Sequence, residues 1–116
     1  MSDEEPIDDT TESAVNSEHA APEAVLDELF ETIESRKANL PEGSYTTTLF
    51  THEKGENYVL EKLGEELTEV LLAAKDDDAA ELQYESADLV YHLLVLLSMK
   101  GLTVDDLRDE LRSRFH

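Results

Sequence analysis

Residues 85–97 read Glu-Ser-Ala-Asp-Leu-Val-Tyr-His-Leu-Leu-Val-Leu-Leu, and this stretch decides the fold class. Between positions 89 and 97, every residue except His92 is apolar or tyrosine. A helix that is apolar on almost every side is buried on several sides. The other helices that the sequence predicts are too short to cover it alone. We therefore expect a second copy of the chain to complete the core as a homodimer.

Helical periodicity continues on both sides of this stretch. Apolar residues spaced three and four apart predict four helices, at about residues 22–38, 53–75, 79–100 and 103–115. Leu40-Pro41-Glu42-Gly43 ends the first helix, and Gly101 ends the third. One aspartate of residues 76–78 is expected to cap the third helix at its N-terminus. Thr103 and Asp106 have the spacing of a capping box at the start of the fourth.

The segment from Ser44 to Thr51 is rich in hydroxyl side chains and is expected to form a loop or an irregular strand. Nowhere do polar and apolar residues alternate for long, so no regular sheet is predicted. The predicted fold class is all-α. The helices at 53–75 and 79–100 form an antiparallel helical hairpin core, which homodimerisation completes as a helix bundle.

The acidic residues are unevenly distributed. The 116 residues include 29 Asp and Glu against nine Lys and Arg, a net charge of −20. Residues 1–23 hold eight acids and no Lys or Arg, and they are predicted to be a disordered acidic tail. Residues 24–116, the predicted domain, still carry a net charge of −12. Such an acidic surface suits a very salty cytoplasm and predicts a halophilic source. An acidic interaction tail is the alternative interpretation.

The composition also excludes several classes of protein. The chain has no cysteine, which rules out disulfides, thiolate zinc sites and cysteine nucleophiles. No window approaches the roughly 18 apolar residues of a membrane span. The acidic excess argues against nucleic-acid binding, which requires a basic surface. A cytoplasmic location is the expectation, with neither nucleic acid nor membrane as a partner.

Two pairs of acids interrupt the apolar pattern of the hairpin helices. Glu66 and Glu69 lie three residues apart on one helix, and Glu85 and Asp88 lie three apart on the next. The turn between the helices centres on Asp77. Glu69 and Glu85 are equally distant from that centre, and so are Glu66 and Asp88. An antiparallel hairpin would therefore hold two levels of facing carboxylates, roughly 4.5 Å apart at about 1.5 Å per residue.

Four converging carboxylates beside apolar residues must keep protons or bind a divalent cation. Oxygen ligands without cysteine favour Mg²⁺, or Mn²⁺, and Mg²⁺ commonly recruits a polyphosphate substrate. Glu65 is a fifth candidate ligand. Lys62 and His92 are predicted to form a further level at one end. His92 is interpreted as a core histidine rather than a ligand, and its spacing from Asp88 and Glu85 does not match a dinuclear iron site. The competing interpretation is that these acids are ordinary solvated helix faces.

Three segments resemble the phosphoribosyl-ATP pyrophosphohydrolase family in order and spacing. They are Pro41-Glu42-Gly43-Ser44-Tyr45-Thr46 with Leu49-Phe50, Lys62-Leu63-Gly64-Glu65-Glu66 through Glu69 to Ala73-Ala74-Lys75, and Glu85-x-Ala87-Asp88-Leu89-x-Tyr91-His92-Leu93-Leu94. The resemblance covers residues 24–116. It extends more weakly, through the acidic pairs alone, to the wider group of all-α nucleoside-triphosphate pyrophosphohydrolases that includes the MazG-type enzymes.

The resemblance implies hydrolysis of phosphoribosyl-ATP to phosphoribosyl-AMP and pyrophosphate, the second step of histidine biosynthesis, with Mg²⁺ on the four acids. Removal of non-standard nucleotides, as in MazG-type enzymes, and a non-enzymatic acidic helical adaptor remain alternatives. The candidates for substrate contact are the few basic residues of the domain and the hydroxyl segment: Arg36, Ser44, Tyr45, Thr46, Lys54 and Lys62. Arg108, Arg112 and Arg114 are expected to be surface charges.

Overall fold

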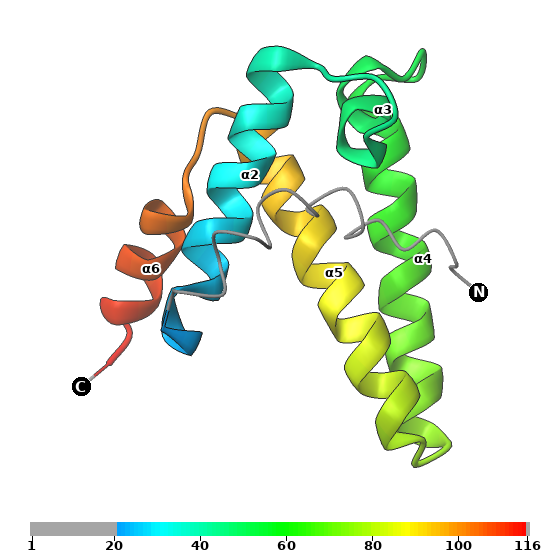
Figure 1. Ribbon diagram of the computed structural model, residues 1–116. Coiled ribbons are helices and arrows are strands. Elements are labelled where there is room, and N and C mark those ends of the chain that lie inside the picture. Colours follow the sequence, from blue (N-terminus) through cyan, green and yellow to red (C-terminus); the bar gives the residue numbers. More distant parts are fainter. Residues whose placement is uncertain (1–20, 116) are drawn as a thin grey trace.

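The computed structural model describes residues 21–115, and all regular structure within them is helical (Figure 1). The elements are a 3-10 turn, η2 (Pro22–Ala24), and five α-helices: α2 (Val25–Asn39), α3 (Tyr45–Thr51), α4 (Glu56–Lys75), α5 (Ala79–Met99) and α6 (Val104–Arg112). The all-α prediction is confirmed. Most of the predicted acidic tail, residues 1–20, lies outside the described residues, so the structure does not address it.

The helix-capping predictions are confirmed by the backbone contacts. Asp78 caps α5, because its Oδ1 accepts a hydrogen bond from the backbone N–H of Glu81 at 3.1 Å. Gly101 follows α5 with φ of 79°, a left-handed conformation that glycine adopts readily. Thr103 and Asp106 each accept a hydrogen bond from the other's backbone N–H, at 3.1 and 2.9 Å. These local signals therefore place both ends of α5 and the start of α6 correctly.

The hydroxyl segment was predicted as a loop or irregular strand, and this prediction is wrong. Residues 45–51 form the helix α3, and Ser44 caps it by accepting a hydrogen bond from the Thr47 N–H at 3.1 Å. Threonine has a low helix propensity, but tertiary packing overrides it here because Leu49 and Thr46 are buried in the core. This short helix brings Tyr45 and Thr46 against α5.

Two other boundaries differ from the sequence prediction. The second long helix, α4, begins at Glu56 rather than Glu53, because Gly55 has φ of 62° and interrupts the helical backbone. The last helix, α6, ends at Arg112, so Phe115 lies beyond it and is 74 % exposed instead of packing in the core.

The cap on α3 gives a first testable prediction. Ser44→Ala should lower the free energy of unfolding by about 1 kcal/mol, because a helical N–H loses its acceptor. Ser35→Ala, at an exposed position inside α2, should change it by less than about 0.5 kcal/mol. Urea unfolding of both variants measures the difference. Equal stabilities of the two variants would mean that the cap contributes nothing to α3.

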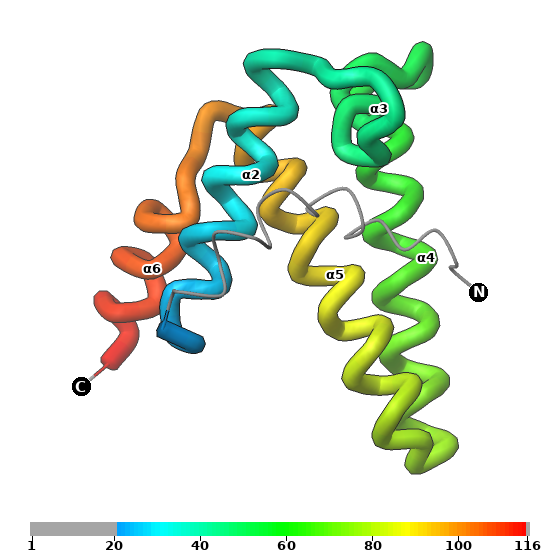
Figure 2. The backbone as a smooth tube through the Cα atoms, viewed as in Figure 1, coloured from blue at the N-terminus to red at the C-terminus, as the bar shows by residue number. Residues whose placement is uncertain are grey.

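Helices α4 and α5 form a long antiparallel hairpin, which the tube in Figure 2 traces from α3 down to the turn at Asp77 and back. Helix α2 packs on the upper part of α5 and also contacts α3 and α6. Arg108 of α6 donates a hydrogen bond to Asp27 of α2 at 2.7 Å. The buried core lies where α2, α3, α4, α5 and the start of α6 meet, and comprises Phe30, Ile33, Leu49, Val59, Tyr91, Leu94, Val95 and Val104.

The lower half of the hairpin projects beyond the other helices (Figure 1). This half therefore packs mainly within the pair α4–α5, and it carries exposed apolar side chains, among them Leu67, Leu71 and Leu72. Within residues 21–115, no helix is by itself long and apolar enough to cross a membrane. Only α5 and α6 together reach that length and hydropathy, as a pair bent by 107°.

Candidate metal centre

Three carboxyl groups meet between α4 and α5. Glu69, Glu81 and Glu85 each contribute one oxygen to a group whose members lie within 4.8 Å of one another. The predicted level of Glu69 and Glu85 is consistent with this arrangement. Glu81 was missed by the sequence analysis, although it lies four residues before Glu85 and therefore on the same helix face. That spacing is the signal that would have identified it.

Glu85 is the most unusual acid of this group. Its side chain is fully buried, and neither carboxylate oxygen has a hydrogen-bond partner among the described residues. Burial is the largest cause that raises the pKa of Glu85, and the neighbouring carboxyls of Glu81, Asp88 and Glu69 act in the same direction, so that together they raise it from 4.5 to about 7. The solvated-face interpretation is therefore wrong for Glu85, since a solvated carboxyl would not show this environment.

Glu66 and Asp88, the second predicted level, are also buried. Glu66 Oε1 lies 2.8 Å from His92 Nδ1, while Glu66 Oε2 has no hydrogen-bond partner within residues 21–115. His92 is predicted to lie level with Lys62, and its ring contacts Glu66. The contact forms because side chains lean toward the N-terminus of their own helix and α4 and α5 run in opposite directions.

These residues fit a hard divalent cation. The observation that supports the fit is a set of buried carboxylate oxygens, on Glu66 and Glu85, that lack any hydrogen-bond donor. Oxygen-only ligands of this kind suit Mg²⁺ or Mn²⁺. Glu65, in contrast, points away from such an environment: its side chain is 64 % exposed and lies 3.6 Å from Lys62 Nζ.

Comparison with known proteins identifies the family. The family model described as phosphoribosyl-ATP pyrophosphohydrolase matches residues 26–115. The chain belongs to this family. The phosphoribosyl-ATP pyrophosphatase of Haloarcula marismortui is 74 % identical over 78 % of this chain and 92 % of the relative. The enzyme of Natronomonas pharaonis is 74 % identical over 78 % of this chain and 89 % of the relative. The enzyme of Haloquadratum walsbyi is 62 % identical over 80 % of this chain and 93 % of the relative.

These three relatives are haloarchaeal proteins, which confirms the halophilic origin that the acidic composition predicts. The phosphoribosyl-ATP pyrophosphohydrolase domain begins near α2 and ends after α6, so the acidic residues 1–20 lie outside the match. The surplus of acids within the matched part is consistent with folding in concentrated salt, where repulsion between like charges is screened.

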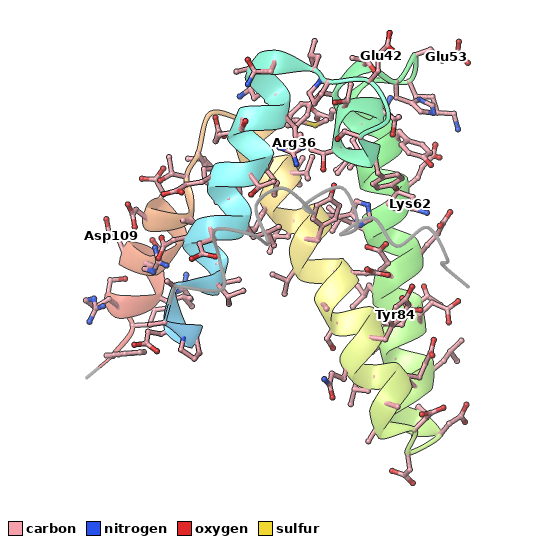
Figure 3. All side chains as sticks on the ribbon, in the orientation of Figure 1. Arg36, Glu42, Glu53, Lys62, Tyr84 and Asp109 are labelled. Atoms are coloured by element: carbon pink, nitrogen blue, oxygen red, sulfur yellow. The ribbon has the colours of Figure 1, made fainter. Side chains whose placement is uncertain are left out.

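The basic candidates for substrate contact differ in their environments within this pyrophosphohydrolase domain. Figure 3 labels Arg36 on α2 and Lys62 on α4, and both side chains are largely buried. Lys54 is exposed and forms an ion pair with Glu61 at 3.1 Å. Arg108 and Arg114, predicted as surface charges, form ion pairs with acids on or near α6.

The three hydroxyl candidates have internal partners. Ser44 caps α3, and Thr46 Oγ1 bonds the hydroxyl of Tyr91. The Tyr45 hydroxyl lies 3.3 Å from His92 Nε2. These contacts place the segment of residues 44–46 beside the buried part of α5.

Proposed function

We propose that this enzyme hydrolyses phosphoribosyl-ATP to phosphoribosyl-AMP and pyrophosphate with a divalent cation, Mg²⁺ or Mn²⁺, held between α4 and α5. Family membership supports the reaction. The observation that carries the metal site is the buried Glu85 carboxyl, which has no hydrogen-bond donor and faces Glu69 and Glu81. A cytoplasmic location remains a prediction.

The proposed ligands are Glu66, Glu69, Glu85 and Asp88, with Glu81 added by the structure. Mg²⁺, when bound, neutralises phosphate charge and polarises the phosphoanhydride. The protein contributes four or five carboxylates that are already positioned in a partly buried site. The side chains around the phosphates therefore need little reorganisation during the reaction. One carboxylate not fully used by the cation would orient the attacking water in line with the phosphorus that it attacks.

Arg36 and Lys62 are the proposed phosphate contacts. Both are buried, and a buried guanidinium or ammonium interacts with a phosphate more strongly than an exposed one does. Lys54 is the weaker candidate because its side chain is exposed, so water and salt screen its charge, and because it pairs with Glu61 at the surface. We keep all three as proposals for the substrate site.

The test is a substrate panel. Pyrophosphate release is measured in concentrated KCl with phosphoribosyl-ATP, ATP and several deoxynucleoside triphosphates, each with Mg²⁺ and with EDTA. Preference for phosphoribosyl-ATP that depends on Mg²⁺ supports the proposal. Equal or faster hydrolysis of the other nucleotides would favour the MazG-like function, and the absence of any hydrolysis would favour a non-enzymatic adaptor.

We also propose that the enzyme is a homodimer. The supporting observation is the projecting half of the hairpin, where Leu67, Leu71 and Leu72 are about half exposed (Figure 1). Further exposed apolar side chains, Val90 and Leu93, lie on α5. A second hairpin packed on this one would bury these side chains and complete a helix bundle.

Light scattering tests the dimer directly. In concentrated KCl the wild-type protein should have twice the mass of one chain, and Leu71→Lys should shift the equilibrium toward the monomer, because a lysine would be buried at the interface. The matched control is Leu111→Lys on α6, which is 52 % exposed and lies away from the hairpin, against 57 % for Leu71. A wild-type monomer at working concentration would contradict the proposal.

A further inference from the structure

Three side chains from three helices form a hydrogen-bonded chain that leads to the proposed metal centre. The Tyr45 hydroxyl of α3 lies 3.3 Å from Nε2 of His92 on α5, and Nδ1 of the same ring lies 2.8 Å from Glu66 Oε1 on α4. Glu66 and His92 are fully buried. The ring of Tyr45 also meets the ring of His92 edge to face, with centroids 6.0 Å apart.

The direction of these hydrogen bonds follows from their partners. His92 Nδ1 also lies 3.2 Å from the backbone carbonyl oxygen of Asp88, which can only accept a hydrogen bond. Nδ1 therefore carries the hydrogen and donates it to Glu66 and to this carbonyl. In the neutral ring Nε2 then has a lone pair and accepts the hydrogen of the Tyr45 hydroxyl.

The hydrogen bonds from Tyr45 through His92 end on one carboxylate oxygen of Glu66, and the other oxygen is not bonded by them. Oε1 is bonded by His92, whereas Oε2 is buried and has no hydrogen bond to any residue that the structure describes. Glu66 lies one helical turn before Glu69, a member of the carboxylate cluster, so both side chains extend from the same face of α4. Partners behind a ligating carboxylate restrict its rotation and present its remaining oxygen to the cation.

We infer that His92 and Tyr45 are positioning residues that orient Glu66 as a ligand of the divalent cation. The inference rests on the proposed metal site. His92 itself does not bind the cation, because its Nδ1 donates a hydrogen bond to Glu66 and its Nε2 accepts one from the Tyr45 hydroxyl. Tyr45 acts one step further away: its hydroxyl holds the His92 ring in the orientation and tautomer that donate to Glu66.

The test compares two replacements of His92 that have similar branched shapes. Asparagine can place an N–H near the position of Nδ1, whereas leucine has no hydrogen-bonding group. Binding of Mn²⁺ to the substrate-free protein is measured by calorimetry in concentrated KCl, beside urea unfolding of the metal-free forms. His92→Leu should weaken Mn²⁺ binding by about 10-fold or more, and His92→Asn should stay close to the wild type. A purely structural histidine would alter the unfolding curves and leave Mn²⁺ affinity unchanged.

Tyr45→Phe provides a second, milder test that leaves the core packing intact. It should weaken Mn²⁺ binding measurably, by about 3-fold or more but by less than His92→Leu does. Tyr58→Phe is its control, because the ring of Tyr58 stacks on His52. If His92→Leu does not fold, Tyr45→Phe decides. Unchanged Mn²⁺ affinity in His92→Leu overturns the inference. If that variant does not fold, unchanged Mn²⁺ affinity in Tyr45→Phe overturns it. The inference also fails if His92→Asn binds Mn²⁺ as weakly as His92→Leu.

Glu66→Gln separates this inference from the proposed metal site. If the wild type binds no Mn²⁺, or Glu66→Gln binds it as tightly as the wild type, the assignment of Glu66 as a ligand fails and the inference fails with it. If Glu66→Gln loses binding while His92→Leu retains it, the metal site stands and only the positioning role is overturned.

Discussion

Glu69→Gln should reduce the turnover of phosphoribosyl-ATP on the order of 100-fold or more. Glutamine keeps the shape of the side chain but removes a charge from the group formed with Glu81 and Glu85. A neutral amide oxygen holds a divalent cation against the phosphates much less firmly than an ionised carboxylate. Steady-state pyrophosphate release, measured at saturating substrate and over a range of Mg²⁺ concentrations, gives the effect.

The same variant has a distinct signature in stability. Without a divalent cation the cluster is repulsive, so Glu69→Gln should be as stable as the wild type or more stable. With Mg²⁺ at about 100 times its dissociation constant, the wild type gains about 2.7 kcal/mol that the variant largely lacks. Unfolding curves should therefore show the variant at least as stable as the wild type in EDTA. In Mg²⁺ its advantage in unfolding free energy should shrink or change sign.

A matched control removes the same charge elsewhere. Glu110→Gln, at an exposed position on α6, loses only an ion pair with Arg114 and should leave turnover and Mg²⁺ response unchanged. Normal turnover in Glu69→Gln would show that this residue is not a ligand. The proposed metal centre, which depends on Glu69 and Glu85, would then be contradicted.

The metal-free protein should lose stability as the pH rises through 7, and Glu85 should be the main cause. Its pKa is about 7 in the folded state, against 4.5 for an ordinary glutamate, because of burial and the neighbouring Glu81, Asp88 and Glu69. Between these two values the native state binds more protons than the unfolded state, so the free energy of unfolding falls with rising pH. At about 1.4 kcal/mol per pKa unit, the loss is on the order of 3 kcal/mol and is complete above about pH 8.

Glu85→Gln isolates this contribution. Glutamine has no proton to lose, so the variant should be more stable than the wild type at pH 8 in EDTA and closer to it at pH 5. Carboxyls outside the cluster titrate alike in both proteins and cancel in the difference. The neighbouring Glu69, Glu81 and Asp88 lose a repulsive charge in the variant at high pH, which acts in the same direction. Urea unfolding at several pH values in concentrated KCl measures it. Parallel stability curves for the two proteins would contradict a raised pKa at Glu85.

Much of the fold is predictable from local signals. Caps at Asp78 and Thr103 and the glycine at position 101 place both ends of α5 and the start of α6, because capping involves only groups within about four residues of one another. The same approach fails for α3. Its threonines favour other conformations, and the helix forms because Leu49 reaches a core built by residues far away in the sequence.

The sequence by itself determined the all-α class, the α4–α5 hairpin and the presence of acids on its facing sides, since periodicity and turn position depend only on residue order. Only the tertiary structure decided which acids meet. Glu81 joins Glu69 and Glu85, and Glu66 pairs with His92. These contacts depend on the rotation of α4 about its axis and on the lean of each side chain toward its own N-terminus. Neither quantity is specified by counting residues from the turn.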